Sequence, residues 1–228
     1  IQIMQALGHT HPSFAHHSLL TGPQGEALSK RLGTLSLRDL RDRGVEPAAL
    51  LSMMARLGSS QPIEVMSNLE EIAAHFDPST FGAAPTKFDA EDLFPLTRQY
   101  VQGLPFDAVA AQIKTLGVPD DLALGFWQVA RDNIMILADL AGWWQLFSQG
   151  AEPFIDTEDA DFVAQAMTLL PAGKLDEHSW GQWTTAVKEA TGRKGKGLFM
   201  PLRKALTGQE HGPDMRHILP LLQIIRVR

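Results

Sequence analysis

Apolar residues that recur three and four positions apart constrain the fold of this chain more than any other feature of its sequence. Leu50, Met54 and Leu57, for example, fall on one face of a helix. Pro47 precedes that stripe and Gly58 follows it, at positions that these residues prefer near helix ends. The same reasoning predicts helices over 35–43, 48–57, 69–75, 89–102, 106–116, 122–147, 157–170, 180–190, 198–206 and 214–222.

Strand-like alternation is weak and confined to the N-terminal segment, around 1–3 and 18–20. No repeat of constant period runs through the sequence. We therefore expect a mainly all-α fold with a short irregular or β-like segment at the N-terminus. A boundary between helical subdomains is expected at 149–156, where Gly150 and Pro153 follow the longest helical run.

The charge is unevenly distributed along the chain. The formal net charge is −6, which by itself argues against a nucleic-acid-binding protein. Residues 1–43 carry five basic and three acidic groups, 44–150 carry five and thirteen, and 151–228 carry ten of each. Residues 188–204 hold six basic groups against Glu189 alone, a local charge of +5. This cluster is a candidate electropositive patch, and the alternative is a solvated helix end and turn.

Residue types exclude several classes of site. The chain has no cysteine, so disulfides, thiolate metal ligands and cysteine nucleophiles are ruled out, which fits the reducing cytoplasm where we expect the protein. No run of about 18 apolar residues suggests a membrane span. The N-terminal histidines have no acidic neighbour before Glu26, so we expect no metal site. They are His9, His11, His16 and His17.

Catalytic motifs are missing as well, and we expect no catalytic residue in this chain. The sequence contains neither a Gly-x-Ser-x-Gly elbow nor a His-Glu-x-x-His pair. The run 192–197 (GRKGKG) looks like a phosphate loop, but Lys196 is followed by Gly197 instead of serine or threonine. A flexible basic turn that contacts phosphates remains physically reasonable.

A second loop, 25–33 (GEALSKRLG), combines small residues with a hydroxyl and two cations. Such a loop can fold over a triphosphate. Ser29 and backbone amides would donate hydrogen bonds, and Lys30 would neutralise the charge that develops on a leaving pyrophosphate. The spacing of these residues is by itself weak evidence for triphosphate binding, because a Ser-Lys-Arg loop is more often simply exposed to solvent.

Motifs in a fixed order along the chain resemble those of one enzyme family. The first are Phe14-Ala15-His16, Ser18-Leu19-Leu20, Ala27-Leu28-Ser29-Lys30-Arg31, Leu37-Arg38-Asp39-Leu40 and Pro47-Ala48-Ala49-Leu50-Leu51. Then come Phe76-Asp77, Pro85-Thr86-Lys87-Phe88-Asp89, the segment 195–208 (GKGLFMPLRKALTG) and His211-Gly212-Pro213. The chain resembles the glutamyl-tRNA synthetases, which are class I aminoacyl-tRNA synthetases, from just before the KMSKS loop to the anticodon-binding end.

The resemblance implies an ATP-binding, KMSKS-type loop made of Ala27, Leu28, Ser29, Lys30 and Arg31. Lys30 stands where the family's lysine engages ATP during amino-acid activation, and Ser29 and Arg31 flank it. Ala27 stands at the first position of the signature, where the family normally has lysine. That departure removes one charge that would face the phosphates.

The resemblance also implies tRNA contacts near the C-terminus. Met200, Pro201 and Arg203 fall in the segment that lies against the anticodon bases in the family, where unstacked bases are read by packing and edge hydrogen bonds. The implied phosphate contacts, which position the RNA without specifying its sequence, are Arg193, Lys194 and Lys196. An alternative for Met200 and Pro201 is purely structural, since proline suits the first turn of a helix.

The parent enzyme that the resemblance implies ligates glutamate to tRNA(Glu) with ATP and Mg²⁺. A complete member carries a nucleotide-binding α/β half with the HIGH motif before the KMSKS loop, and nothing in this chain matches it. We therefore expect the tRNA-binding half of a monomeric, cytoplasmic enzyme, without tightly bound cofactor, membrane association or activity of its own. The expected division is 1–60 for the KMSKS loop and stem-contact segment, then 61–150 and 151–228 for two helical anticodon-binding subdomains.

Two further hypotheses, from other classes of protein function, are also compatible with parts of the sequence. One is a helical protein-interaction module without an RNA role, which the acidic middle and the pair Trp143-Trp144 would suit, although such a pair more often lies in a core. The other is a self-standing ATP-using enzyme. That enzyme would need a second phosphate-binding element and an acid/base group, and the sequence offers neither.

Overall fold

The structure is a computed structural model that describes residues 1–28 and 36–227. The chain divides into two compact units, Ile1–Tyr100 and Val101–Arg228. The three-part division expected from the sequence stays a prediction.

The first unit contains α1 (Gln2–Ala6), β1 (Leu20–Thr21), α2 (Leu37–Asp42), α3 (Pro47–Met54), α4 (Leu69–Ala74), η2 (Pro78–Thr80), β2 (Thr86–Lys87) and η3 (Ala90–Asp92), and α5 (Leu93–Gly103) begins in it. Two side chains cap helical elements here: the Asn68 side chain accepts from the Glu71 N–H of α4 at 2.8 Å, and Asp89 accepts from the Glu91 N–H of η3 at 3.0 Å. The strand-like expectation at 1–3 is wrong, because these residues close helical hydrogen bonds.

Strands β1 and β2 pair in parallel, with Leu20 opposite Thr86. Gly58 lies against this pair with φ +88°. A Cβ there would come within 2.6 Å of the Ser18 hydroxyl oxygen and 2.7 Å of that of Thr86. Only glycine therefore combines this left-handed backbone with so close an approach. A small core of five buried side chains lies in the same unit: Leu40, Val45, Met53, Phe88 and Leu93.

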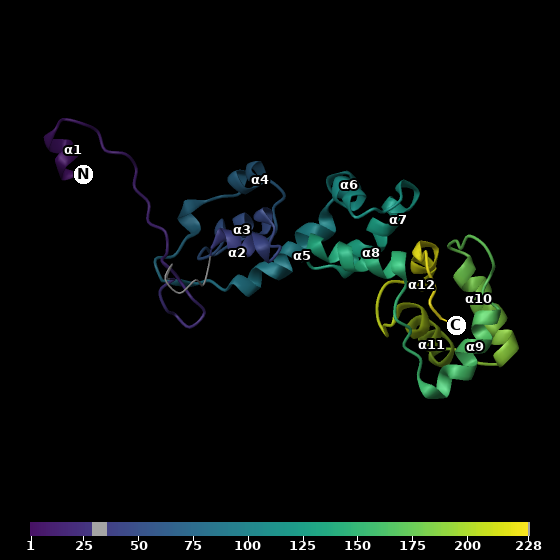
Figure 1. Ribbon diagram of the computed structural model, residues 1–228. Coiled ribbons are helices and arrows are strands. Elements are labelled where there is room, and N and C mark those ends of the chain that lie inside the picture. The colour runs from purple at the N-terminus through teal and green to yellow at the C-terminus, as the bar shows by residue number, and fades with distance from the viewer. Residues whose placement is uncertain (29–35, 228) are drawn as a thin grey trace. The chain divides into compact units, whose positions relative to one another are not determined.

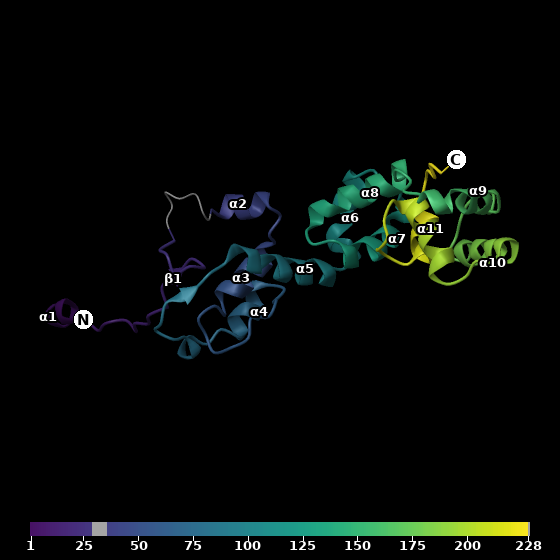
Figure 2. The same cartoon turned by 90° about the horizontal axis from the view of Figure 1, so that it is seen from below.

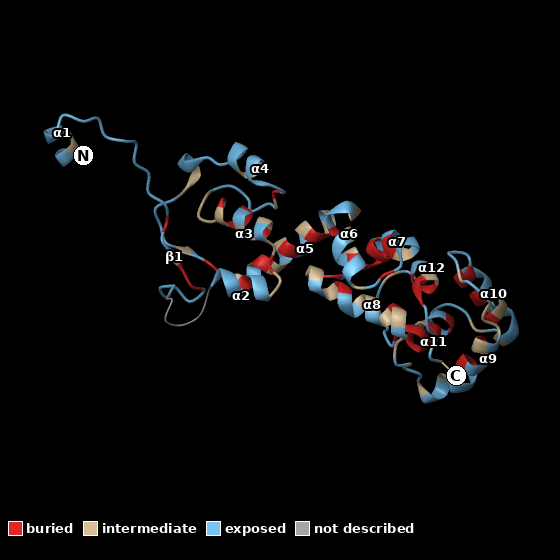
Figure 3. Cartoon of the chain, turned by 45° about the horizontal axis from the view of Figure 1, so that its top comes forward, coloured by how far each residue is buried: buried red, intermediate tan, exposed pale blue. Residues whose placement is uncertain are grey.

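The second unit is helical: α6 (Phe106–Thr115), α7 (Asp120–Ala130), η4 (Arg131–Asn133), η5 (Leu137–Asp139), α8 (Leu140–Gln149), η6 (Thr157–Asp159), α9 (Ala160–Thr168), α10 (Ser179–Thr191), α11 (Lys196–Thr207), α12 (Met215–Ile218) and η7 (Leu219–Leu221). Helices α9, α10 and α11 lie side by side in two perpendicular views (Figures 1 and 2). Buried residues on α7, α10 and α11 contribute to one core, which includes Trp127 and Trp183 (Figure 3). The Trp183 indole N–H donates to the Ala166 carbonyl at 2.8 Å.

The prediction of a single helix over 122–147 is wrong. The chain leaves the helical conformation after η4, and Ile134 and Ile136 are extended. The Asp139 carboxylate accepts from the N–H groups of Met135 (2.8 Å) and Ile136 (3.1 Å), so these amides find a side-chain partner in place of a helical one. The break also turns Ile134 into the core, where it is 2% exposed.

The mainly all-α expectation is confirmed for the described residues, whose only strands are the two short parallel ones. None of the described helices has the length and apolar content needed to cross a bilayer. The pair Trp143-Trp144 packs against the core, with the Trp144 and Phe126 ring centroids 5.6 Å apart. The structure therefore gives this pair a packing role, which removes the main support for the protein-interaction alternative.

Candidate nucleic-acid interface

The start of the KMSKS-type loop is held by a tight turn. The Gly22 N–H donates to the Glu26 carbonyl at 2.8 Å, and Ala27 forms an antiparallel bridge with Thr21 at the end of β1. Leu28 follows with 38% of its surface exposed. Three residues expected to bind ATP, Ser29, Lys30 and Arg31, lie outside the described residues. The turn thus anchors Ala27 beside the β1–β2 pair.

The six basic residues of 188–204 do not form one uniform patch. Lys204 is buried: its ammonium group pairs with Asp156 at 2.6 Å and Glu210 at 3.6 Å, and it lies 4.3 Å from the centre of the Phe154 ring. The hydrogen bond to Asp156 raises the pKa of Lys204. Its charge is therefore neutralised within the fold. Of the residues predicted to contact tRNA, Lys194 and Lys196 are exposed, and neither pairs with a carboxylate in the described part of the chain.

Arg193 holds the basic turn in place. Its guanidinium group pairs with Asp159 and stacks on the Phe162 ring, 4.1 Å from the centroid. It also donates to the Gly197 carbonyl at 3.3 Å. Pro201 lies inside α11 and has no N–H to give to that carbonyl, four residues back. Arg193 thus replaces the helical hydrogen bond that Pro201 removes.

Met200 and Pro201 lie on α11. Pro201 is buried and Met200 is half-buried. Because α11 begins at Lys196, Pro201 lies in the interior of the helix, and the first-turn explanation for it is wrong. The role predicted for these two residues in contacting anticodon bases stays a prediction.

Arg203 lines a cavity of about 260 Å³ on this unit. The other lining residues are Trp180, Phe199, Asp214 and Met215. The ring centroids of Trp180 and Phe199 are 6.3 Å apart, and Phe199 is 44% exposed. The Arg203 guanidinium donates to the Pro213 carbonyl at 2.6 Å. Burial lowers the pKa of Arg203 and the charge of Asp214 opposes that shift, but an arginine stays cationic at neutral pH.

One face of α11 brings these groups together. Lys196, Phe199 and Arg203 are spaced by three and four residues, so they lie along the same side of the helix. A cation, an exposed aromatic ring and a guanidinium group in that order suit a phosphate followed by an unstacked base. Sequence reasoning missed Trp180, Phe199, Asp214 and Met215 as cavity residues. Only the i, i+3, i+7 spacing from Lys196 to Phe199 and Arg203 could have signalled Phe199.

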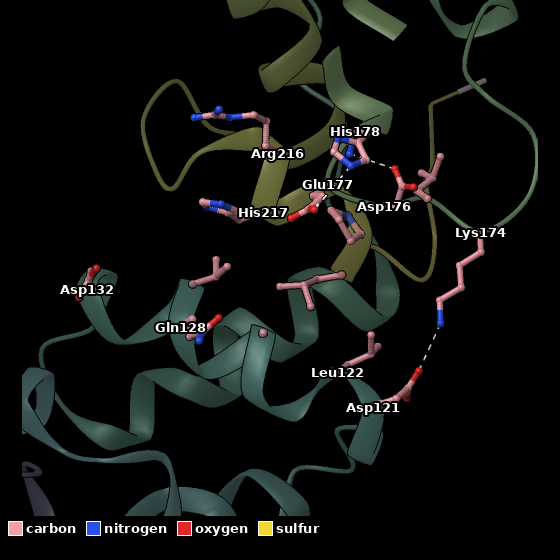
Figure 4. Close-up of a pocket in the computed structure, with 15 residues that line it drawn as sticks. Asp121, Leu122, Gln128, Asp132, Lys174, Asp176, Glu177, His178, Arg216 and His217 are labelled. Carbon is pink, nitrogen blue, oxygen red and sulfur yellow. Dashed lines mark hydrogen bonds and ion pairs between the residues drawn. The ribbon is translucent and has the colours of Figure 1, made fainter. Parts of the chain in front are cut away.

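A larger groove of about 750 Å³ lies between α7, the segment 174–178 and α12 (Figure 4). Its four carboxylates outnumber its two cations. Both cations are engaged, since Lys174 pairs with Asp121 at 3.4 Å and Arg216 pairs with Asp214 at 2.6 Å. Such a surface repels phosphates and is not part of the candidate interface. Over residues 1–28 and 36–227, no three or more His, Asp or Glu side chains gather as a metal site would require.

Two family models match the chain. "tRNA synthetases class I (E and Q), catalytic domain" matches residues 1–95, and "Anticodon binding domain" matches residues 120–227.

Similar proteins are known by name and by structure. Glutamate–tRNA ligase 1 of Cereibacter sphaeroides (strain ATCC 17025 / ATH 2.4.3) is 74% identical to this chain. The match covers the whole chain and 52% of the relative's length. Glutamate–tRNA ligase 1 of Ruegeria pomeroyi is 67% identical, and the match again covers the whole chain and 52% of the relative's length. The chain thus spans about half the length of the curated relatives it matches. The crystal structure of a glutamate-tRNA synthetase from Elizabethkingia anophelis has the same fold, with a TM-score of 0.76 at 23% identity over 97% of this chain and 50% of that one.

Proposed function

The chain belongs to the glutamyl-tRNA synthetase family, and on that premise we propose that it is the tRNA-binding part of a glutamate–tRNA ligase. The parent enzyme would join glutamate to tRNA(Glu) with ATP. It would work as a monomer in the cytoplasm, which the absence of cysteine fits. Within this part, the second unit would bind the anticodon.

The observation that carries this proposal is the face of α11 formed by Lys196, Phe199 and Arg203. Phe199 provides exposed aromatic surface on which a base released from the anticodon stack can lie, and Trp180 supports it from within the fold. Arg203 supplies N–H donors at the same cavity, and Lys196 with its neighbour Lys194 supplies charge for the adjoining phosphates. The net negative charge of the chain does not oppose RNA binding at this face, because Lys194 and Lys196 are unpaired where the RNA would lie.

For the other end of the chain we propose that Lys30, flanked by Ser29 and Arg31, engages ATP. Support comes from the motif and from the turn that anchors Ala27 ahead of it. Mg²⁺ usually keeps several waters and binds through substrate phosphates. We therefore propose that this ion would bind through the phosphates of ATP.

Replacing Lys194 and Lys196 by alanine should make tRNA binding less sensitive to salt. Each phosphate contact contributes about 0.7 to the slope of log K against log salt for single-stranded RNA, so the double variant should lower the magnitude of the slope by about 1.4. Filter binding or fluorescence anisotropy across a salt series measures it. The control variant Lys114→Ala/Lys174→Ala removes two exposed lysines of the same unit away from α11. Equal slopes for the two double variants would contradict the assigned phosphate contacts.

The 228-residue chain on its own should not activate glutamate. Amino-acid activation needs a nucleotide-binding half with the HIGH motif, which this sequence does not contain. Glutamate-dependent exchange of pyrophosphate into ATP should therefore stay at the background level of a reaction without protein, while tRNA binding is retained. Exchange above that background would disprove the proposal that these residues only bind.

A further inference from the structure

The turn between α10 and α11 presents two lysines from a short, sharply bent segment. Gly192 ends α10 with φ +72°, and Gly195 precedes α11 with φ +58°. Lys194 lies between these glycines and Lys196 begins α11, and both lysines are exposed. Glycine permits the bend but does not by itself fix it. A contact from outside the turn is therefore needed to hold the two lysines in one arrangement.

Arg193 makes that contact. Its guanidinium group donates to the Gly197 carbonyl at 3.3 Å, which closes the segment that contains both lysines. The same group pairs with Asp159 and lies 4.1 Å from the centroid of Phe162, a core residue that is 6% exposed. The Arg193 N–H also donates to the Thr191 hydroxyl oxygen at 3.3 Å. Arg193 thus joins the turn to α9 and to α11 at once.

Asp159 is committed to the same contact. It stands at the N-cap of α9, where an aspartate usually accepts a hydrogen bond from the first turn, yet its carboxylate accepts none there. Its one ion pair in the described part of the chain is with Arg193, and its side chain is 14% exposed. If Arg193 turned away to reach a phosphate, a largely buried carboxylate would lose its cation, which is costly. We therefore expect the pair to stay intact when RNA binds.

We propose that Asp159 and Arg193 are positioning residues for RNA binding: the pair holds the turn so that Lys194 and Lys196 face the phosphates, and Arg193 itself contacts no phosphate. This inference rests on the function proposed above for the α11 face. A carboxylate, which by its charge alone repels RNA, thereby becomes a residue that tRNA binding needs.

Asp159→Asn is the sharpest test, because charge and positioning predict opposite results. A guanidinium freed to contact a phosphate, with one negative charge fewer beside it, would strengthen tRNA binding. Under the proposal the lysines lose their fixed arrangement, so binding should weaken about two- to tenfold, the range for ordering one mobile side chain on binding. Anisotropy of labelled tRNA over a salt series measures it. Asp159→Glu should restore most of the affinity, and the control Glu158→Gln, which removes the same charge from an exposed neighbour, should not weaken binding.

Arg193→Gln tests the pair from its other side. The lysines still meet the phosphates in the complex, so the affinity should fall by a similar factor while the slope of log K against log salt stays unchanged. A direct phosphate contact by Arg193 would instead lower the magnitude of the slope by about 0.7. The double variant Asp159→Asn/Arg193→Gln should bind no more weakly than the weaker single variant, because residues that act as a unit are not additive.

Unchanged or tighter binding by Asp159→Asn would overturn the positioning role, and so would a slope lowered by about 0.7 in Arg193→Gln. Loss of the far-UV circular dichroism of the original chain in both variants would overturn it too, since the pair would then serve the fold alone. Lys194→Ala/Lys196→Ala is measured in the same series. An unchanged slope for that variant would contradict the proposed function, whereas a lowered slope together with tighter binding by Asp159→Asn would contradict only this inference.

Discussion

Replacing Phe199 by alanine is expected to weaken tRNA binding roughly 5- to 150-fold, because stacking of one base on an aromatic side chain is worth about 1–3 kcal/mol. Phe199 is 44% exposed and borders the cavity that Trp180 and Arg203 also line. Its removal takes away the accessible wall of that cavity, since Trp180 is only 8% exposed. The salt dependence of binding should not change, because no phosphate contact is lost.

The measurement is anisotropy of labelled tRNA at a fixed salt concentration. Phe199→Tyr keeps the aromatic face and should retain most of the affinity. Leu124→Ala, which removes an apolar side chain of similar exposure (51%) from α7, is the matched control and should bind like the original chain. If Phe199→Ala also binds like the original chain, the cavity on α11 does not hold a base.

Replacing Trp183 by alanine should cost the second unit about 3–5 kcal/mol of its free energy of unfolding, the usual range for removing a large buried aromatic side chain. Trp183 is fully buried, and its ring packs edge-on against Trp180 with centroids 5.6 Å apart. Because Trp180 lines the cavity beside Arg203, the loss of packing should reach the proposed interface, and tRNA binding should fall with stability. Urea unfolding followed by far-UV circular dichroism measures the change in free energy.

A companion variant separates packing from hydrogen bonding. Trp183→Phe keeps most of the ring contacts but removes one of the two hydrogen bonds that the Ala166 carbonyl accepts, the other coming from the Leu169 N–H at 3.0 Å, and this loss should cost about 0.5–1.5 kcal/mol. A Trp183→Ala chain that unfolds at the same urea concentration as the original would mean that Trp183 does not hold the core of this unit together.

Local patterns in the sequence were enough to predict most helices. The stripe of Leu50 and Met54 became α3, and the helix predicted over 69–75 became α4, which Asn68 caps. These predictions succeeded because helix periodicity and capping depend on residues within one or two turns. The helix predicted over 122–147 failed because Asp139 and the burial of Ile134 compete with helical hydrogen bonding.

The candidate interface could be predicted only in part. The motif led to Arg203, which does line the cavity, and to Lys194 and Lys196, which are exposed. It gave no reason to name Trp180 or Met215, which reach the cavity from α10 and α12. Residues from separate helices meet only when the helices pack, and periodicity within each helix does not specify that packing.

The sequence by itself determined a mainly helical chain, its family resemblance and a run of six basic residues in 188–204. Which of those six charges can meet an RNA was decided by tertiary structure alone. Lys204 is buried between Asp156 and Glu210, and Arg193 is bound to Asp159 and to the carbonyl that Pro201 leaves open. Asp156 and Asp159 lie far from these two residues in the sequence, and Glu210 and the Gly197 carbonyl come within reach only because of the course of α11. A charge is available to a ligand only where the fold has not already paired it, and pairing over such distances is set by packing.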